Sequence, residues 1–323
     1  MKLLLIVALV GAASAFVERA EWEAFKSTHG KTYSNIIEEF HRMKVYADNK
    51  EFVDKHMAEY AEGKHTFTVA LNKFADLTTD EFSSLYKGYV AQSSRPHATH
   101  QLTGKAVAVT VDWRDQGVVT PIKDQGQCGS CWAFSTTGSL EAAWKMAGNE
   151  LASLSEQQLV DCSGHYGNQG CNGGLMDSAF KYIRAKGGIE SESSYPYTAR
   201  NGHCKEDEGK FVASLSSYVD VRSGSESDLE DAVSNVGPIS VAIDASHQSF
   251  QLYHSGVYSE ARCSSSRLDH GVLAIGYGTE GGSDYWLVKN SWGRSWGEEG
   301  FIKMTRNHRN QCGIATQASY PTV

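Results

Sequence analysis

Apolar and polar positions in the first third of the chain repeat with the spacing of a long helix. Six positions recur at intervals of three or four residues and therefore share one helix face: Glu38, Arg42, Tyr46, Asn49, Val53 and Met57. Glu38 and Arg42 also stand four residues apart in the order that favours an ion pair on a helix. The pattern predicts an amphipathic helix over residues 38–57.

Further along the chain, helical spacing gives way to short strands. Helices are predicted over Ser130–Gly148, from Ser155 onward and over Leu175–Lys186, because polar starts and glycine stops flank each apolar repeat. Beyond residue 236, β-forming runs broken by Gly and Asn predict four strands: Ile239–Ile243, His270–Tyr277, Tyr285–Lys289 and Phe301–Met304. Helices in one half and antiparallel strands in the other indicate an α+β protein of two lobes with a cleft between them.

Composition marks two boundaries before these lobes. Lys2, the apolar run Leu3–Val10 and the small residues that end at Ala15 are typical of a secretory signal peptide, which we expect to be cleaved after Ala15. Residues 88–106 contain Gly, Ser and Pro and are typical of an extended linker that a protease could enter. Because cysteines occur only after this stretch, we place a domain boundary near residue 107.

Overall composition excludes several classes of protein. The chain has 323 residues, of which 41% are hydrophobic and 21% charged, so a disordered or fibrous protein is not expected. The formal net charge of −8 argues against nucleic acid or an anionic membrane as the main partner. No segment after the signal peptide is apolar enough to predict a membrane anchor.

The seven cysteines suit the oxidising compartment that a signal peptide implies. Seven is an odd number, so three disulfides would leave one free thiol, and spacing alone does not decide the pairing. Cys131 begins a predicted helix, where the positive end of the helix dipole favours the thiolate form.

Three other roles are possible for Cys128 and Cys131: a redox pair, half of a zinc site and two structural half-cystines. A zinc site would need a second closely spaced pair, and Cys162 and Cys171 stand too far apart. A redox pair would lie in a βαβ pattern, which is not visible here. With one thiol left unpaired, a bridged Cys128 beside a free Cys131 fits best.

Three separated motifs carry a resemblance to a known family. The run Gln125–Phe134, which contains Cys128-Gly129-Ser130-Cys131-Trp132, is similar to the active-site motif of papain-like cysteine peptidases. Leu268–Val272 and Lys289–Gly293 resemble the motifs around the histidine and the asparagine of that family. The resemblance covers nearly the whole chain and implies a helical lobe and an antiparallel β-barrel-like lobe, with the active-site cleft between them and a helical prosegment in front.

The resemblance implies a role for each catalytic residue. Cys131 would be the nucleophile and His270 the group that takes and returns its proton, as a thiolate–imidazolium pair. Asn290 would orient the imidazole, and Trp292 would shield that hydrogen bond from water. Gln125 and the backbone N–H of Cys131 would form the oxyanion hole. No cofactor and no metal are implied.

Disulfides and substrate contacts also follow from the resemblance. The implied pairs are Cys128 with Cys171, Cys162 with Cys204, and Cys263 with Cys312. Gly173 and Gly174 would pair with the backbone of an extended substrate. The pocket that selects the residue second from the scissile bond, the S2 pocket, corresponds to six positions: Leu175, Met176, Ala242, Leu268, Gly271 and Gln317. We expect it to prefer an apolar residue, with Gln317 shortening its floor or admitting a polar group.

The early helix resembles the inhibitory prosegment of cathepsin L-type precursors. The two motifs of that prosegment are represented by Glu38, Arg42, Val45, Tyr46, Asn49 and Val53, with Met57 in place of the usual asparagine, and by Ala70, Asn72, Phe74 and Asp76, with Ala70 in place of the usual glycine. The expected organisation is a signal peptide over 1–15, a prosegment over 16–106 and a mature peptidase over 107–323, with lobes over roughly 118–217 and 218–323. We expect cleavage near 104–110, promoted by acid as carboxylates such as Asp76 lose charge.

The resulting prediction is a cysteine endopeptidase made as an inactive precursor, whose partners are protein and peptide substrates and its own prosegment. Cystatin-like inhibitors and a monomeric state are implied by the resemblance alone. The alternatives are a catalytically silent relative that binds or inhibits other proteins and, less in keeping with the motifs, a redox or metal protein. The secretory pathway is expected, and the sequence leaves the lysosome and an extracellular or digestive lumen equally open.

Overall fold

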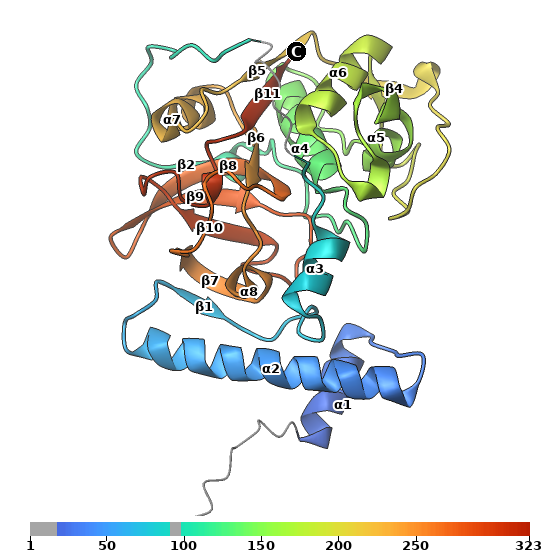
Figure 1. Ribbon diagram of the computed structural model, residues 1–323. Coiled ribbons are helices and arrows are strands. Elements are labelled where there is room, and N and C mark those ends of the chain that lie inside the picture. Colours follow the sequence, from blue (N-terminus) through green and yellow to red (C-terminus); the bar gives the residue numbers. More distant parts are fainter. Residues whose placement is uncertain (1–17, 91–97) are drawn as a thin grey trace, which may run out of the picture.

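A computed structural model describes residues 18–90 and 98–323 (Figure 1). The predicted signal peptide lies outside the described residues. Three helices build one lobe: α4 (Cys131–Met146), α5 (Glu156–Cys162) and α6 (Met176–Lys186). A two-stranded sheet of β3 (Ile189–Glu190) and β4 (Phe211–Ala213) lies in the same part of the chain.

The second lobe is built on a nine-stranded sheet. Eight strands follow the order β1-β7-β10-β9-β8-β6-β11-β5, and β2 pairs with β8. The strands are β1 (Phe67–Val69), β2 (Val111–Asp112), β5 (Ser217–Asp220), β6 (Ile239–Ile243), β7 (Tyr253–Tyr258), β8 (His270–Glu280), β9 (Ser283–Lys289), β10 (Phe301–Thr305) and β11 (Ala318–Thr322). Helices α7 (Glu226–Asn235) and α8 (Gln248–Gln251) lie against this lobe (Figure 1).

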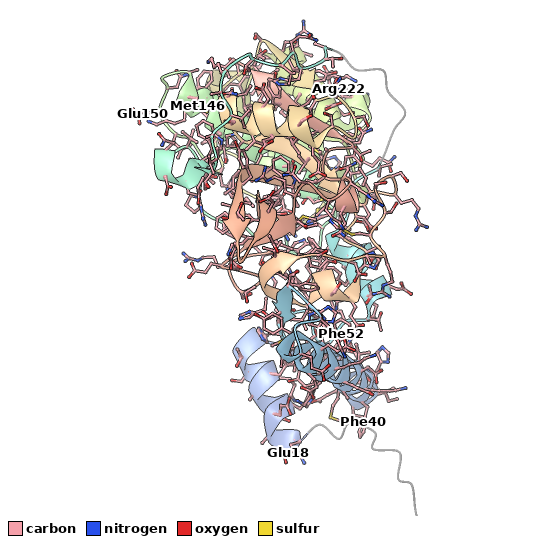
Figure 2. The ribbon with its side chains drawn as sticks, turned by 90° about the vertical axis from the view of Figure 1, so that its left-hand side faces the viewer. Glu18, Phe40, Phe52, Met146, Glu150 and Arg222 are labelled. Carbon is pink, nitrogen blue, oxygen red and sulfur yellow. A yellow bond between two sulfur atoms is a disulfide. The ribbon has the colours of Figure 1, made fainter. Side chains whose placement is uncertain are left out.

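The segment before residue 90 forms a separate helical layer beside the strand lobe. It contains α1 (Arg19–His29), the long α2 (Ile36–Ala61) and α3 (Thr79–Tyr86), and it passes the end of the strand lobe (Figures 1 and 2). The side chain of Asn35 accepts two backbone N–H groups at the start of α2, and Thr78 with Glu81 forms a capping box at the start of α3. Strand β1 pairs antiparallel with β7, so this layer shares a sheet with the strand lobe.

Close packing of α4 on β8 brings the two lobes together. A Cβ atom at Gly138 would lie 2.8 Å from Cδ2 of Leu273, so a larger residue here would require the Leu273 side chain to shift. The hydroxyl of Ser135 also donates to the backbone carbonyl of Val272 at 2.7 Å. Helix α4 begins at Cys131 and β8 begins at His270, and the packing therefore places both residues at the junction of the lobes.

The α+β architecture and the predicted later elements are present with small shifts of their ends. The helix predicted over 38–57 extends to Ile36–Ala61, and the strand predicted over His270–Tyr277 continues to Glu280. The described parts of the predicted linker are attached to the lobes, because Gly88 lies in the cleft and residues 98–103 contact the strand lobe. Within the described ranges, none of the helices is both long and apolar enough to cross a membrane.

Candidate active site

Cys131 is a buried thiol at the first turn of α4. Its side chain has no exposed surface, and among the described residues it is the free cysteine. Its Sγ atom accepts a hydrogen bond from the backbone N–H of Gly271, the residue after His270, at 3.3 Å. This contact joins the start of the helix to the start of β8.

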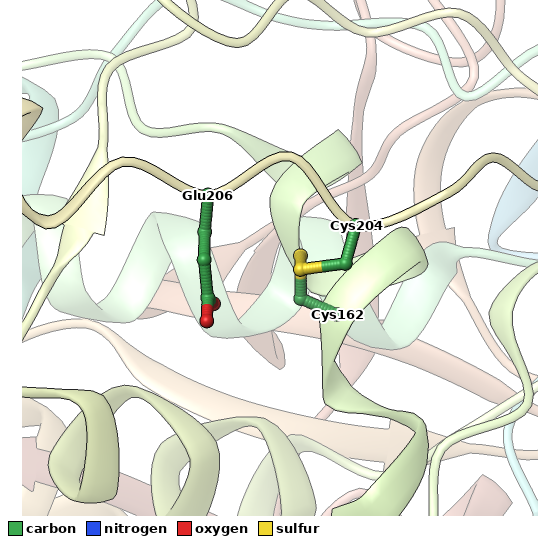
Figure 3. A group of neighbouring side chains, drawn as sticks. All are labelled: Cys162, Cys204 and Glu206. Carbon is green, nitrogen blue, oxygen red and sulfur yellow. A yellow bond between two sulfur atoms is a disulfide. The ribbon is translucent and has the colours of Figure 1, made fainter.

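The other six cysteines form the three disulfides that the resemblance implied: Cys128–Cys171, Cys162–Cys204 and Cys263–Cys312. The first fastens the turn before α4 to the segment that leads to Gly173 and Gly174. The second lies near Glu206 (Figure 3), but its sulfur atoms are bonded to each other. They are therefore not thiolates that could bind a metal ion.

His270 is held in a fixed orientation on the strand side of the site. Its Nε2 atom lies 2.8 Å from Oδ1 of Asn290, and since an amide oxygen only accepts, Nε2 is the donor. The indole of Trp292 stacks on the imidazole with ring centroids 4.4 Å apart and 23° between the planes. Nδ1 is buried without a hydrogen-bond partner among the described residues. That nitrogen is free to exchange a proton with a neighbouring group.

Burial keeps the thiol and the imidazole uncharged in this structure. It raises the pKa of Cys131 to about 11, despite the N–H groups of Gly271 and Gly88 that favour the thiolate. Burial also lowers the pKa of His270 to about 3, despite its hydrogen bond to Asn290. Burial in the covered cleft therefore opposes the thiolate and imidazolium forms, which are the reactive ones.

Gln125 points its amide at the cleft. Nε2 donates to the carbonyl oxygens of Tyr86 at 3.0 Å and Cys128 at 2.7 Å. Oε1 accepts from the hydroxyl of Ser291 at 2.7 Å, and this bond fixes which way the amide faces. The side-chain amide of Gln125 is therefore already bonded to a carbonyl of the segment that precedes the two lobes, that of Tyr86.

The segment Lys87–Val90 fills the cleft and pairs with both walls. On one wall, Gly174 donates to the carbonyl of Gly88 at 2.8 Å and accepts from the N–H of Val90 at 3.2 Å. On the other, the N–H groups of Gly88 and Tyr89 point to the carbonyl of Asp269 at 3.2 and 3.0 Å. A Cβ atom at Gly88 would lie 2.0 Å from the carbonyl oxygen of Gly129, so this passage requires glycine.

Tyr89 occupies the place predicted for the S2 pocket. It belongs to one buried cluster with Leu175, Met176, Ala242 and Leu268, while a cavity of about 350 Å³ beside it is lined in part by Leu175, Met176 and Gln317. Its hydroxyl donates to Oε1 of Gln317 at 3.2 Å.

Backbone contacts link Ala242 and Gly271 to the other positions predicted for this pocket. The backbone N–H of Ala242 donates to the carbonyl of Gln317 at 3.0 Å, and Ala242 is opposite Gly271 in the pairing of β6 with β8. A Cβ atom at Gly271 would meet Sδ of Met176 at 3.2 Å. The structure thus links the predicted pocket positions to one another, and Tyr89 lines one cavity with Leu175, Met176 and Gln317.

Several charged residues near the site were missed by sequence reasoning. Lys87 is buried and pairs with Asp269 at 2.6 Å, directly before His270. Behind the site, Lys123 bonds Glu141 at 3.0 Å and Glu156 at 2.6 Å. Charged residues are usually assigned to the surface, and no pattern in the sequence distinguishes these.

A free thiol at a helix start, an oriented imidazole, an amide aimed at the cleft and a peptide segment that covers all three define a latent cysteine hydrolase. The comparisons specify the class further. The family model described as "Papain family cysteine protease" matches residues 107–322, and that of the "Cathepsin propeptide inhibitor domain (I29)" matches residues 22–82. The chain belongs to the papain family of cysteine proteases, and its prosegment makes it a cathepsin L-like zymogen.

Similar proteins cover almost the same length. Digestive cysteine proteinase 1 of Homarus americanus is 53% identical over 304 residues, which are 94% of each chain. Cathepsin L of Sarcophaga peregrina is 50% identical over 338 residues, covering 99% of this chain and 98% of its own. The solved structure of digestive procathepsin L 3 from the larval midgut of Tenebrio molitor is 46% identical, with a TM-score of 0.88 over 94% of this chain and 98% of that one.

Proposed function

We propose that Cys131 and His270 are the catalytic pair of this protease. The assignment depends on one observation: the free thiol of Cys131 is bonded to the start of β8, whose first residue is His270. One ring nitrogen of this histidine is hydrogen-bonded to Asn290, and the other has no hydrogen-bond partner among the described residues. Once the cleft is hydrated, the proton of the thiol moves to Nδ1 of His270, and the thiolate attacks the carbonyl carbon of the peptide. His270 then returns the proton to the leaving amine, which departs as an acyl-enzyme forms.

Water completes the reaction. His270 takes a proton from the water as its oxygen attacks the acyl carbon, and returns it to the sulfur when the thioester breaks. Asn290 orients the imidazole throughout, and Trp292 covers their hydrogen bond. The amide of Gln125, with the N–H of Cys131, stabilises the oxyanion of each tetrahedral intermediate. The hydrogen bond from Gln125 to the carbonyl of Tyr86 supports this role, because it shows a donor available for a peptide oxygen.

The S2 pocket should prefer an apolar or aromatic residue with tolerance for a polar end. Tyr89 supports this preference, because its ring packs in the apolar cluster while its hydroxyl meets Gln317. Gly173 and Gly174 would hold the backbone of a substrate as Gly174 now holds that of Gly88 and Val90. Profiling wild type and Gln317→Ala on a peptide library would test the pocket; identical profiles would contradict the role of Gln317.

We further propose that residues 16–106 are removed near 104–110, and that acid promotes this step. Asp76 supports an acid-sensitive prosegment: its carboxylate accepts from Lys31 at 2.7 Å and from the hydroxyl of Tyr33 at 2.9 Å. A neutral side chain at this position could not keep the ion pair with Lys31. Equal rates of processing at pH 4 and pH 7 would contradict the proposal.

One experiment separates an active peptidase from a silent relative. Acid-processed protein should cleave a peptide amide and lose that activity when a single thiol is alkylated. The Cys131→Ser variant should have no peptidase activity. A processed protein that binds peptides without cleaving them would contradict the assignment. The matched control is His254→Ala, which changes an exposed histidine of β7.

The destination and partners are also proposals. The three disulfides support the secretory pathway, and the digestive and cathepsin L relatives support either a digestive lumen or a lysosome. Cystatin-like inhibitors and a monomeric state rest on the family resemblance. Imaging of tagged precursor would distinguish the two destinations.

A further inference from the structure

The segment before the proposed cleavage region is attached to the strand lobe outside the cleft. Thr99 pairs in parallel with Asp220 at the end of β5, the last strand on that side of the sheet. The N–H of His100 donates to the carbonyl of Asp220 at 2.7 Å, and the N–H of Asp220 donates to that of Ala98 at 2.8 Å. The backbone of this segment therefore pairs with the edge strand β5 through a single bridge, between Thr99 and Asp220.

The side chain of His100 is buried between two groups of the strand lobe. The residue is only 4% exposed, with Nε2 2.9 Å from Oδ2 of Asp231 and Nδ1 3.0 Å from the hydroxyl of Tyr320. Because a carboxylate only accepts, Nε2 donates to Asp231, and Nδ1 is within hydrogen-bond distance of the Tyr320 hydroxyl. Both ring nitrogens are thus satisfied by groups that lie outside the catalytic cleft.

Asp231 is built to receive this segment. The backbone N–H and the hydroxyl of Thr103 donate to its two oxygens at 2.9 and 2.8 Å, and Nδ2 of Asn235 donates at 3.0 Å. The carboxylate is itself buried, with 4% exposure. Three donors from the segment, counting that of His100, therefore compensate a charge that would be costly to bury alone.

We propose that Asp231 and Tyr320 form a peptide-binding site whose occupant is residues 98–103 of this chain, and that this site controls protease access to the junction after Thr103. The inference rests on the proposed boundary near residue 107. A protease must extend several residues on both sides of the bond that it cuts. Here Thr103 is fixed on one side, and Ala108 on the other donates to Ser234 at 3.1 Å and accepts from Tyr277 at 2.7 Å.

Lys105 lies exposed between these two attachment points, which gives a probe that is independent of the enzyme's own activity. Trypsin cuts after lysine, so cleavage at Lys105–Ala106 can be followed by mass spectrometry in a Cys131→Ala zymogen that cannot process itself. Cleavage at Lys64, in the turn after α2, serves as the internal reference. Failure of the catalytic assignment would leave this readout intact.

His100→Ala should speed trypsin cleavage at Lys105 by about tenfold or more, because cleavage follows the fraction of time the segment is detached. The matched control Gln101→Ala, which alters an exposed neighbour whose amide donates only to its own segment, should stay within about twofold. Equal rates for the two variants would overturn the proposal. Faster cleavage of His100→Ala at Lys64 as well would also overturn it, since that would indicate general loosening.

A second substitution checks that the effect passes through the carboxylate. Asp231→Asn should also speed cleavage, and the double variant with His100→Ala should be cut no more than about twice as fast as the faster single variant. Effects that multiply would show that the two residues act separately and would contradict the site. The processed enzyme lacks His100, so its kcat/KM should be unchanged by His100→Ala.

Discussion

Tyr89 offers a direct measure of how firmly the prosegment closes the cleft. The residue is 6% exposed, and Tyr89→Ala would remove a ring whose burial is worth about 1.5–3 kcal/mol. Loss of the hydrogen bond to Gln317 adds about 0.5–1.5 kcal/mol. The backbone contacts of the segment remain, so the closed state should lose about 2–4.5 kcal/mol, which corresponds to a roughly 30- to 2,000-fold larger open population.

The rate at which iodoacetamide alkylates Cys131 in the zymogen at pH 7 reports that population, because the thiol is completely buried when the cleft is closed. Tyr89→Ala should therefore raise the rate by roughly 30- to 2,000-fold, and Tyr89→Phe by no more than about tenfold. Tyr60→Ala, which alters a half-exposed tyrosine near the end of α2, is the matched control. If Tyr89→Ala and Tyr60→Ala are alkylated at the same rate, the reasoning about the S2 pocket is wrong.

Three further predictions concern titration and orientation. Burial lowers the pKa of His56, so its stabilising contribution is present above pH 6.5 and is lost as the pH falls through the lowered pKa. His56→Gln, which keeps a donor for the carbonyl of Phe67, should therefore lower the pH midpoint of processing. Burial raises the pKa of Glu156, so the free energy of unfolding should fall as the pH rises through that raised pKa. Urea unfolding should show no such decline for Glu156→Gln, and the same pH dependence in this variant as in wild type would contradict the prediction. Asn290→Ala should lower kcat/KM by about 10- to 100-fold, because His270 loses its orienting bond, and unchanged kinetics would exclude that role.

The sequence predicted those features that depend on neighbours along the chain. The start of α4 at Cys131 and the repeat that became α2 are local patterns, so both were found with shifts of a few residues. Motif resemblance then connected Cys131 with His270 and Asn290, which no spacing rule could have joined. The structure adds the physical link, a helix that packs on a strand through Gly138.

Features that depend on the cleft itself could not be predicted from local pattern. Gly88 and Tyr89 looked like the beginning of a linker, and only their positions against Gly129 and Gln317 show that they block the site. His100 was likewise part of an apparently open stretch. Its function depends on Asp231, which lies far along the chain, and the sequence gives no sign of that pairing.

The pairing of β1 with β7 has a consequence for the processed enzyme. In the zymogen, β7 is bonded to β1 on one side and to β10 on the other. When the prosegment leaves, the edge of β7 that was paired with β1 has unpaired N–H and C=O groups. These groups can pair with a strand of another molecule. Removal of the prosegment therefore converts a paired edge of β7 into an unpaired one. A denatured mature enzyme should consequently aggregate more readily on refolding than its precursor.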